Sequence, residues 1–199
     1  MRSFVIATAA FMAAGCVTGR HIEDHVGLHF HADLGPGWTA SRASDAGVSR
    51  EFNGVGGIAA VSLGGAIVPN LILGGEVWGA GAIDPEYSED GLAETLDGMS
   101  YDVTAYGARL TYYLMPANLY FSATPSITRL SLYDPFGDTV DYSRWGLGLR
   151  AAIGKEWFVS PRWGLGLAGV LHLSSNDGGP DGPRWRTWGG GLALSASFN

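Results

Sequence analysis

The feature that most constrains the fold is a regular alternation of short and long connections between apolar stretches. Eight stretches of roughly nine to fourteen residues read as β-strands, because large apolar residues recur at every second position. Three connections are tight turns, at 68–70, 115–118 and 159–162. The remaining connections are longer, polar loops at 35–51, 82–98, 134–142 and 174–187. This alternation predicts an antiparallel up-and-down sheet with its tight turns at one end and its long loops at the other.

The composition narrows the class of protein. The chain has 199 residues, and its 31 glycines are spread through the apolar stretches rather than gathered in linkers. The formal charge is −7 and Lys155 is the single lysine, so no basic surface for nucleic acid is expected. After the N-terminal segment no apolar run reaches 18 residues, so the sequence predicts no transmembrane helix.

The two faces of the predicted strands differ in chemistry. On the first strand, Leu28 and Leu34 fall on one face, and His29, His31 and Asp33 fall on the other. On the last three strands, large apolar residues alternate with Gly, Ala and Ser. A soluble protein would decorate this second face with charges, whereas a narrow barrel must fit small side chains into its interior. The sequence therefore predicts an all-β fold, an eight-stranded antiparallel up-and-down transmembrane β-barrel with its leucines toward lipid.

The first residues have the features of an export signal. Arg2 supplies a positive charge, and the apolar run from Phe4 to Ala14 is too short to span a bilayer. We expect a signal peptide at 1–15, a periplasmic spacer at 16–25 and an outer-membrane barrel at 26–199. The run Ala-Ala-Gly-Cys at 13–16 resembles a bacterial lipobox, which implies acylation of Cys16. The alternative is ordinary cleavage nearby with Cys16 unmodified; Cys16 is the only cysteine, so no intramolecular disulfide can form.

Aromatic residues gather near both ends of the predicted strands. Trp and Tyr favour the membrane–water interface because their rings combine an apolar body with a polar edge. The sequence therefore predicts two aromatic girdles. Their expected members are Tyr112, Tyr120, Trp157, Trp163 and Phe198 near the tight turns, and Trp145 and Trp188 near the long loops.

Several turns and strand starts carry a family resemblance. The segments 34–38 (LGPGW), 64–78, 113–120 and 154–164 resemble those of the small outer-membrane β-barrel proteins abundant in myxobacteria. More distantly, residues 26–199 are similar to the barrel domain of outer-membrane protein A. The resemblance implies an outer-membrane location, with the four long loops extracellular, and no known reaction. The final apolar strand, with Phe198 near its end, resembles the signal that the barrel assembly machinery recognises.

Charged residues in the middle of strands point to the lumen. An Arg facing lipid at mid-depth costs about 2–4 kcal/mol, so Arg109 and Arg150 should face inward, as should Glu76. Glu76 and Arg109 lie six residues from their respective tight turns and should therefore pair at similar height. We expect these side chains to form a polar network that closes the barrel. Its expected members are Glu76, Arg109, Arg150, Glu156, His29 and His31.

Two further motifs are candidate chemical sites. His29, His31 and Asp33 share a face and could bind a metal, but no additional ligands are visible, so no metal is expected. His172 and Ser174 resemble the His-x-Ser pair of the outer-membrane lipid A deacylases, which implies acyl hydrolysis. That chemistry needs an acidic residue to orient the histidine, and no glutamate follows Glu156. We therefore expect no catalytic residues and no cofactor.

The loops suggest surface partners. The segment 82–98 carries six acidic residues and no basic residue, so it could bind divalent cations and bridge to lipopolysaccharide. Alternatively, it is a solvated loop whose charges repel one another. Arg184 and Arg186 could contact lipid phosphates or balance Asp177 and Asp181.

The sequence predicts a barrel with a structural or surface-interaction role, a plugged lumen and no catalysis. The first alternative is a narrow channel for small polar solutes or ions, and a lesser one is a lipid acyl hydrolase. At the level of the fold, the alternative is a soluble lipocalin-like barrel, which would turn its leucines inward.

Overall fold

A computed structural model describes residues 24–45, 47–178 and 182–199. The predicted signal peptide, Cys16 and most of the predicted spacer lie outside the described residues. Within the described part, no helix is long and apolar enough to cross a membrane. The strands in that part are β1 (Leu28–Asp45), β2 (Val48–Val68), β3 (Leu71–Ile83), β4 (Glu86–Glu89), β5 (Leu92–Thr95), β6 (Ser100–Leu114), β7 (Leu119–Tyr133), β8 (Thr139–Tyr142), β9 (Gly146–Phe158), β10 (Trp163–Asp177) and β11 (Arg184–Phe198).

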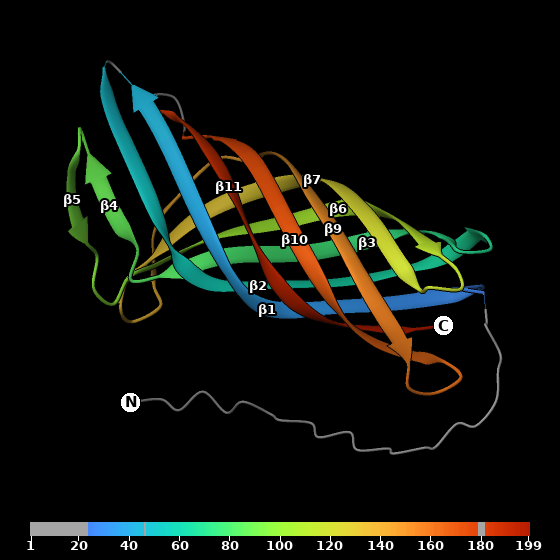
Figure 1. Ribbon diagram of the computed structural model, residues 1–199. Coiled ribbons are helices and arrows are strands. Elements are labelled where there is room, and N and C mark those ends of the chain that lie inside the picture. Colours follow the sequence, from blue (N-terminus) through green and yellow to red (C-terminus); the bar gives the residue numbers. More distant parts are fainter. Residues whose placement is uncertain (1–23, 46, 179–181) are drawn as a thin grey trace.

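The long strands close into a barrel. In the described residues, eight strands of 13 to 21 residues follow one another around the wall in the order β1-β11-β10-β9-β7-β6-β3-β2, and β2 pairs with β1 to close the ring (Figure 1). All of these pairings are antiparallel. The short strands extend the wall at one end, where β4 pairs with β2 and β8 pairs with β7. The predicted eight-stranded antiparallel barrel is confirmed.

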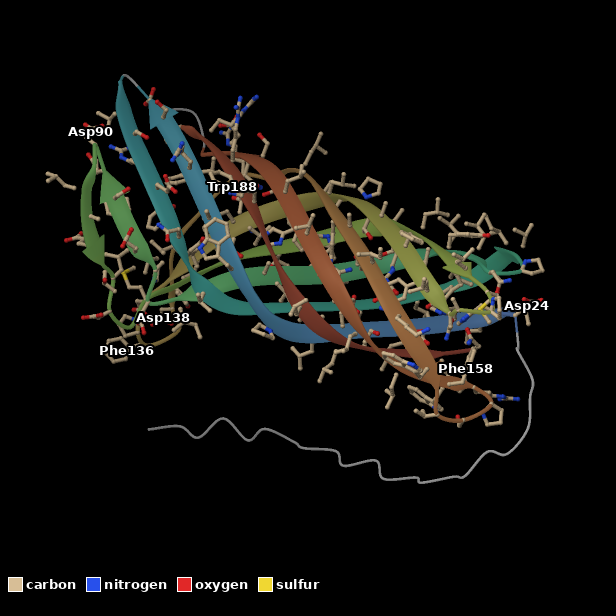
Figure 2. All side chains as sticks on the ribbon, viewed as in Figure 1. Asp24, Asp90, Phe136, Asp138, Phe158 and Trp188 are labelled. Carbon is tan, nitrogen blue, oxygen red and sulfur yellow. The ribbon has the colours of Figure 1, made fainter. Side chains whose placement is uncertain are left out.

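The two ends of the barrel differ as the connections predicted. Each of the three tight turns joins consecutive long strands where it was expected. Asp24 and Phe158 lie at the tight-turn end, whereas Asp90, Phe136 and Asp138 lie at the opposite end (Figure 2). The C-terminal residue also lies at the tight-turn end, where the backbone N–H of Asn199 donates to the carbonyl of Arg162 at 3.0 Å.

The prediction of a long loop at 35–51 is wrong. Strand β1 continues to Asp45 and β2 begins at Val48, so most of this segment is a hairpin that extends the barrel wall. Proline normally interrupts a strand because it lacks an N–H donor. Here Pro36 falls in the gap of the β1–β11 register between Leu34↔Leu194 and Gly37↔Gly191, where no ladder bond is needed. The other three predicted loops also contain short strands or strand ends.

The outer face of the barrel is apolar and its interior is polar. Leu147 and Leu167 expose 72% and 56% of their surface, and Trp145, Leu149 and Leu165 are also exposed. Arg150, by contrast, is 3% exposed. Exposed leucines around a buried charged interior suit a surrounding of lipid and not of water. The soluble lipocalin-like alternative is therefore wrong, and the chain is an outer-membrane barrel with exposed hairpins at one end.

Candidate functional site

Four buried charges meet in the middle of the lumen. Arg109 Nη1 lies 2.5 Å from Glu76 Oε2, and Arg150 Nη1 lies 3.3 Å from the same oxygen. Arg150 Nη2 donates to Asp33 Oδ2 at 2.6 Å, and Arg109 Nη1 lies 3.6 Å from that oxygen. We call Asp33, Glu76, Arg109 and Arg150 the lumen network. They come from β1, β3, β6 and β9, so the contacts cross the barrel.

The lumen network balances its own charge. Two carboxylates face two guanidinium groups, and each of the four side chains is at most 3% exposed. A buried charge is tolerated only when it is paired, because desolvation of a lone ion costs several kcal/mol. The structure therefore brings Glu76, Arg109 and Arg150 together. It also adds Asp33, which the sequence placed on the inward face but not in the network.

A second layer connects the lumen network toward the tight-turn end. His31 Nε2 lies 2.9 Å from Asp33 Oδ1, and His31 Nδ1 lies 3.4 Å from Glu156 Oε1 without hydrogen-bond geometry. The Ser197 hydroxyl donates to Glu156 Oε2 at 2.6 Å. Glu156 thus lies next to the lumen network through His31. His29 Nε2 lies 3.0 Å from the Tyr113 hydroxyl, beside these groups.

Tyr120 is a lumen residue, so its assignment to the aromatic girdle is wrong. It is fully buried, and its hydroxyl donates to Asp33 Oδ1 at 3.4 Å. Its even position on β7 turns it inward, together with Ser122 and Thr124. Its cross-strand partner is Gly154, where an added Cβ would lie 2.5 Å from the Tyr120 ring. The glycine leaves the space that the ring occupies.

His25 is the residue that sequence reasoning missed at the tight-turn end. Its predicted place was the spacer, yet it is fully buried and stacks on Tyr113 with ring centroids 3.6 Å apart. Its ring nitrogens lie 2.8 Å from Asn199 Oδ1 and 2.9 Å from Asn118 Oδ1, and its backbone N–H donates to Asn70 Oδ1 at 2.9 Å. Asn70 and Asn118 are turn residues with positive φ, of 68° and 49°. The sequence signal that could have indicated this site is the presence of an asparagine in each of two consecutive tight turns.

The two candidate chemical motifs both lie on the lumen side of the wall. His172 and Ser174 are both buried on the lumen side, and neither ring nitrogen of His172 bonds to the Ser174 hydroxyl. His31 and Asp33 are engaged by Glu156 and the two arginines, as described above. Among the described residues, no group of three or more His, Cys, Asp or Glu side chains is arranged to hold a metal ion.

The other predicted girdle members lie on the outer surface. Tyr112, Trp157 and Trp163 are exposed toward the tight-turn end, and Trp145 and Trp188 are exposed toward the other end. The Phe198 ring packs edge-on against Trp163, with centroids 5.2 Å apart. Their placement at the two membrane interfaces stays a prediction.

The acidic segment 82–98 is largely a hairpin of β4 and β5. Within it, Glu89 accepts hydrogen bonds from the Tyr87 hydroxyl and from Arg50 Nε, the latter at 3.3 Å. The pKa of the Glu89 carboxyl is held below its ordinary value by these two hydrogen bonds, and the bond from Tyr87 has the larger effect. Together with Asp90, which accepts a hydrogen bond from the Ser49 backbone N–H at 2.9 Å, this carboxylate holds the hairpin against β2.

Comparison with solved structures supports this fold, whereas no protein-family model and no curated protein matches the sequence. Among solved structures, the chain is similar to Neisserial surface protein A, with a TM-score of 0.56 and 17% identity over 88% of this chain and 99% of that one. The chain has the fold of a small outer-membrane β-barrel.

Two further structures match more weakly. One is Ail, the attachment invasion locus protein of Yersinia pestis, solved with the heparin analogue sucrose octasulfate; it has a TM-score of 0.40 and 13% identity over 85% of this chain and 99% of that one. The other is the outer membrane protease OmpT of Escherichia coli, with a TM-score of 0.40 and 11% identity over 86% of this chain and 96% of that one.

Proposed function

We propose that this protein is a non-catalytic surface protein of the outer membrane, whose closed barrel supports the hairpins at its long-loop end as an interaction platform. The observation that carries the proposal is the lumen network. Its contacts cross the barrel from β1 to β9 and from β3 to β9. A lumen that is filled by paired charges serves stability, and the segments left for function are those that extend beyond the wall.

The tight-turn end supports closure as well. His25, Tyr113 and Asn118 fill this end of the barrel with stacked and hydrogen-bonded groups. A solute would have to break this layer and then separate four paired charges. Both steps are costly, since unpaired buried charges and polar groups are penalised.

Conductance across a planar bilayer tests this proposal. We expect the purified wild-type barrel to give no steady open state. Arg150→Ala combined with His25→Ala should introduce conductance because it removes both the guanidinium that bridges Asp33 and Glu76 and the ring that fills the tight-turn end, whereas Arg162→Ala, at an exposed turn, should not. Steady wild-type conductance that changes its ion preference in Arg150→Ala would instead establish the narrow channel.

The channel remains the second candidate because of specific lumen groups. The hydroxyls of Ser122, Thr124 and Ser195 are buried with no hydrogen-bond partner among the described residues. Such groups favour water inside the barrel. The acyl hydrolase is the lesser candidate, since Ser174 faces the lumen and not lipid. Unchanged lipid A products in cells that express Ser174→Ala would remove it.

Arginines on the outer face suggest a contact with lipid phosphates. Arg42 of β1 and Arg186 of β11 lie directly opposite each other in the strand register, and both are exposed. Arg42 already donates to Glu51 through Nε and Nη2, so Arg186 is the charge of this pair that is left to meet an anion. Arg184 lies on the same face, and Trp188 marks the level of the membrane interface. We propose phosphate groups of outer-leaflet lipid, including lipopolysaccharide, as the partners here.

The remaining assignments of targeting and partners are proposals that rest on the sequence. We propose export by the signal peptide at 1–15, anchoring through acylated Cys16 with a short spacer between it and the barrel, and insertion by the barrel assembly machinery through the C-terminal strand. The mass of the mature chain tests the anchor directly. We also propose kinship with the small outer-membrane barrels of myxobacteria and binding of divalent cations by the acidic segment 82–98.

A further inference from the structure

The lumen changes character at its long-loop end. Here β2, β6 and β7 contribute Phe52, Tyr101, Leu130 and Leu132 to the inner wall, and Trp185 of β11 faces them. These residues line a cavity of about 450 Å³, which the β4–β5 hairpin borders with Tyr87 and Glu94. We call this cavity the vestibule. It lies beyond the lumen network, on the side of the exposed hairpins. None of the residues that close the lumen, in the lumen network or around His25, lines it.

The rings of the vestibule are arranged around Phe52. Its centroid lies 4.9 Å from that of Tyr87, 5.3 Å from that of Trp185 and 5.8 Å from that of Tyr101. Tyr101 forms a fixed floor, because it is 2% exposed and its hydroxyl donates to the Thr39 carbonyl at 2.5 Å. Phe52, Tyr87 and Trp185 are partly exposed, so part of each ring is accessible to a ligand.

The charges at the rim are negative on balance. Arg50 is held by Glu89, so these two charges cancel locally. Glu94 lies directly opposite Tyr87 in the β4–β5 register, and Asp141 borders the vestibule from β8. Neither Glu94 nor Asp141 forms an ion pair among the described residues.

We propose that the vestibule binds a small organic cation that carries an apolar or aromatic group. Open aromatic faces attract cations through their quadrupole, and a cluster of such rings is the arrangement that recognises quaternary ammonium groups. Glu94 and Asp141 add charge complementarity, and Leu130 and Leu132 accommodate the apolar part. A cavity of this volume suits a single small ligand. The proposal does not depend on whether the lumen conducts.

Titration calorimetry on the full-length barrel in lipid nanodiscs tests the proposal. The probe is benzyltrimethylammonium at 0.15 M salt, with benzyl alcohol as the neutral control and benzenesulfonate as the anionic control. We expect saturable binding of the cation and binding at least ten-fold weaker for both controls. Equal affinity for benzyl alcohol would overturn the proposal, since the site would then be merely apolar, and so would the absence of cation binding.

The variants separate the vestibule from the acidic surface. Trp185→Leu and Phe52→Leu keep apolar volume but remove an aromatic face, so each should weaken cation binding about ten-fold, and Glu94→Gln should weaken it less. Trp188→Leu is the matched control, because Trp188 lies three residues away on the same strand and faces outward. Cation binding that persists in Trp185→Leu and Phe52→Leu would overturn the proposal. A heat-induced shift in gel mobility verifies that each variant is folded.

Discussion

Arg150 donates a hydrogen bond to Asp33 Oδ2 at 2.6 Å, and this bond joins two strands, β9 and β1, that are not neighbours in the barrel wall. It therefore fixes the distance across the lumen and not merely the register of a strand pair. Arg150 also reaches Glu76 of β3, so one guanidinium serves two carboxylates from different parts of the wall.

Removal of this guanidinium should destabilise the barrel. In Arg150→Leu, Arg109 is the one guanidinium of the lumen network left to face Asp33 and Glu76, and an uncompensated buried charge costs about 3–5 kcal/mol. Urea unfolding in phospholipid vesicles, followed by tryptophan fluorescence, measures the free energy of unfolding. Arg162→Leu, at an exposed turn, is the control and should change it by less than about 0.5 kcal/mol.

A double-variant cycle shows whether the loss comes from the pair. Asp33→Leu combined with Arg150→Leu should cost clearly less than the sum of the single variants, because neither partner then remains alone. Strict additivity of the two losses would contradict the assignment of Asp33 to the lumen network.

The contact between Gly154 and Tyr120 predicts a second loss of stability. Alanine at position 154 would place its Cβ 2.5 Å from the Tyr120 ring, so the ring must shift inside a packed lumen. Overpacking of this kind costs about 1–3 kcal/mol. Gly75→Ala is the matched control, because nothing lies within 4 Å of the Cβ it would add. Equal unfolding free energies of the two variants would show that Tyr120 does not occupy the lumen side of Gly154.

His25 should determine the stability of the tight-turn end. His25→Ala leaves Asn118 and Asn199 without their shared partner, and each unsatisfied buried group costs about 1–3 kcal/mol. Hydrogen exchange of the amides of Asn70 and Asn118 should accelerate, while exchange in the middle of β9 changes little. Val26→Ala, which alters an exposed neighbour, should leave both regions unchanged.

The β4–β5 hairpin should loosen in acid. The pKa of Glu89 is lowered in the folded protein, so its contribution to docking is present above the ordinary value of 4.5 and is lost as the pH falls through the lowered value. Limited proteolysis of reconstituted protein should therefore cut segment 82–98 faster at pH 3 than at pH 6. In Glu89→Gln the cutting should be fast at both pH values; a pH response as large as that of the wild type would refute this role.

Much of the barrel could be predicted from the sequence, because the two-residue period decides which face of a strand meets lipid. The turns at 68–70, 115–118 and 159–162 follow from the short breaks between the apolar stretches, and the inward direction of Arg150 follows from the cost of a charge that faces lipid. Tyr120 lies near a strand end, which favours a girdle position, but its even position on β7 turns it into the lumen. The segment 35–51 lacks a continuous apolar face, because strands that extend beyond the membrane need none.

Contacts across the lumen could not be predicted in the same way. Whether Arg150 meets Asp33 or Glu156 depends on the stagger between strands, and no local pattern in the sequence fixes that quantity. His25 lies outside any strand and is buried only because turns that are distant in sequence converge on it.

The central claim is that the leucine face meets lipid and the charged face fills the lumen, and tryptophan NMR tests it most directly. All seven tryptophans can be labelled with fluorine, and the barrel can be placed in nanodiscs that contain a nitroxide lipid. The account predicts broadened signals for the five outward rings, Trp38, Trp145, Trp157, Trp163 and Trp188, and sharp signals for Trp78 and Trp185. Broadening of Trp78 to the same extent as Trp157 would contradict the account.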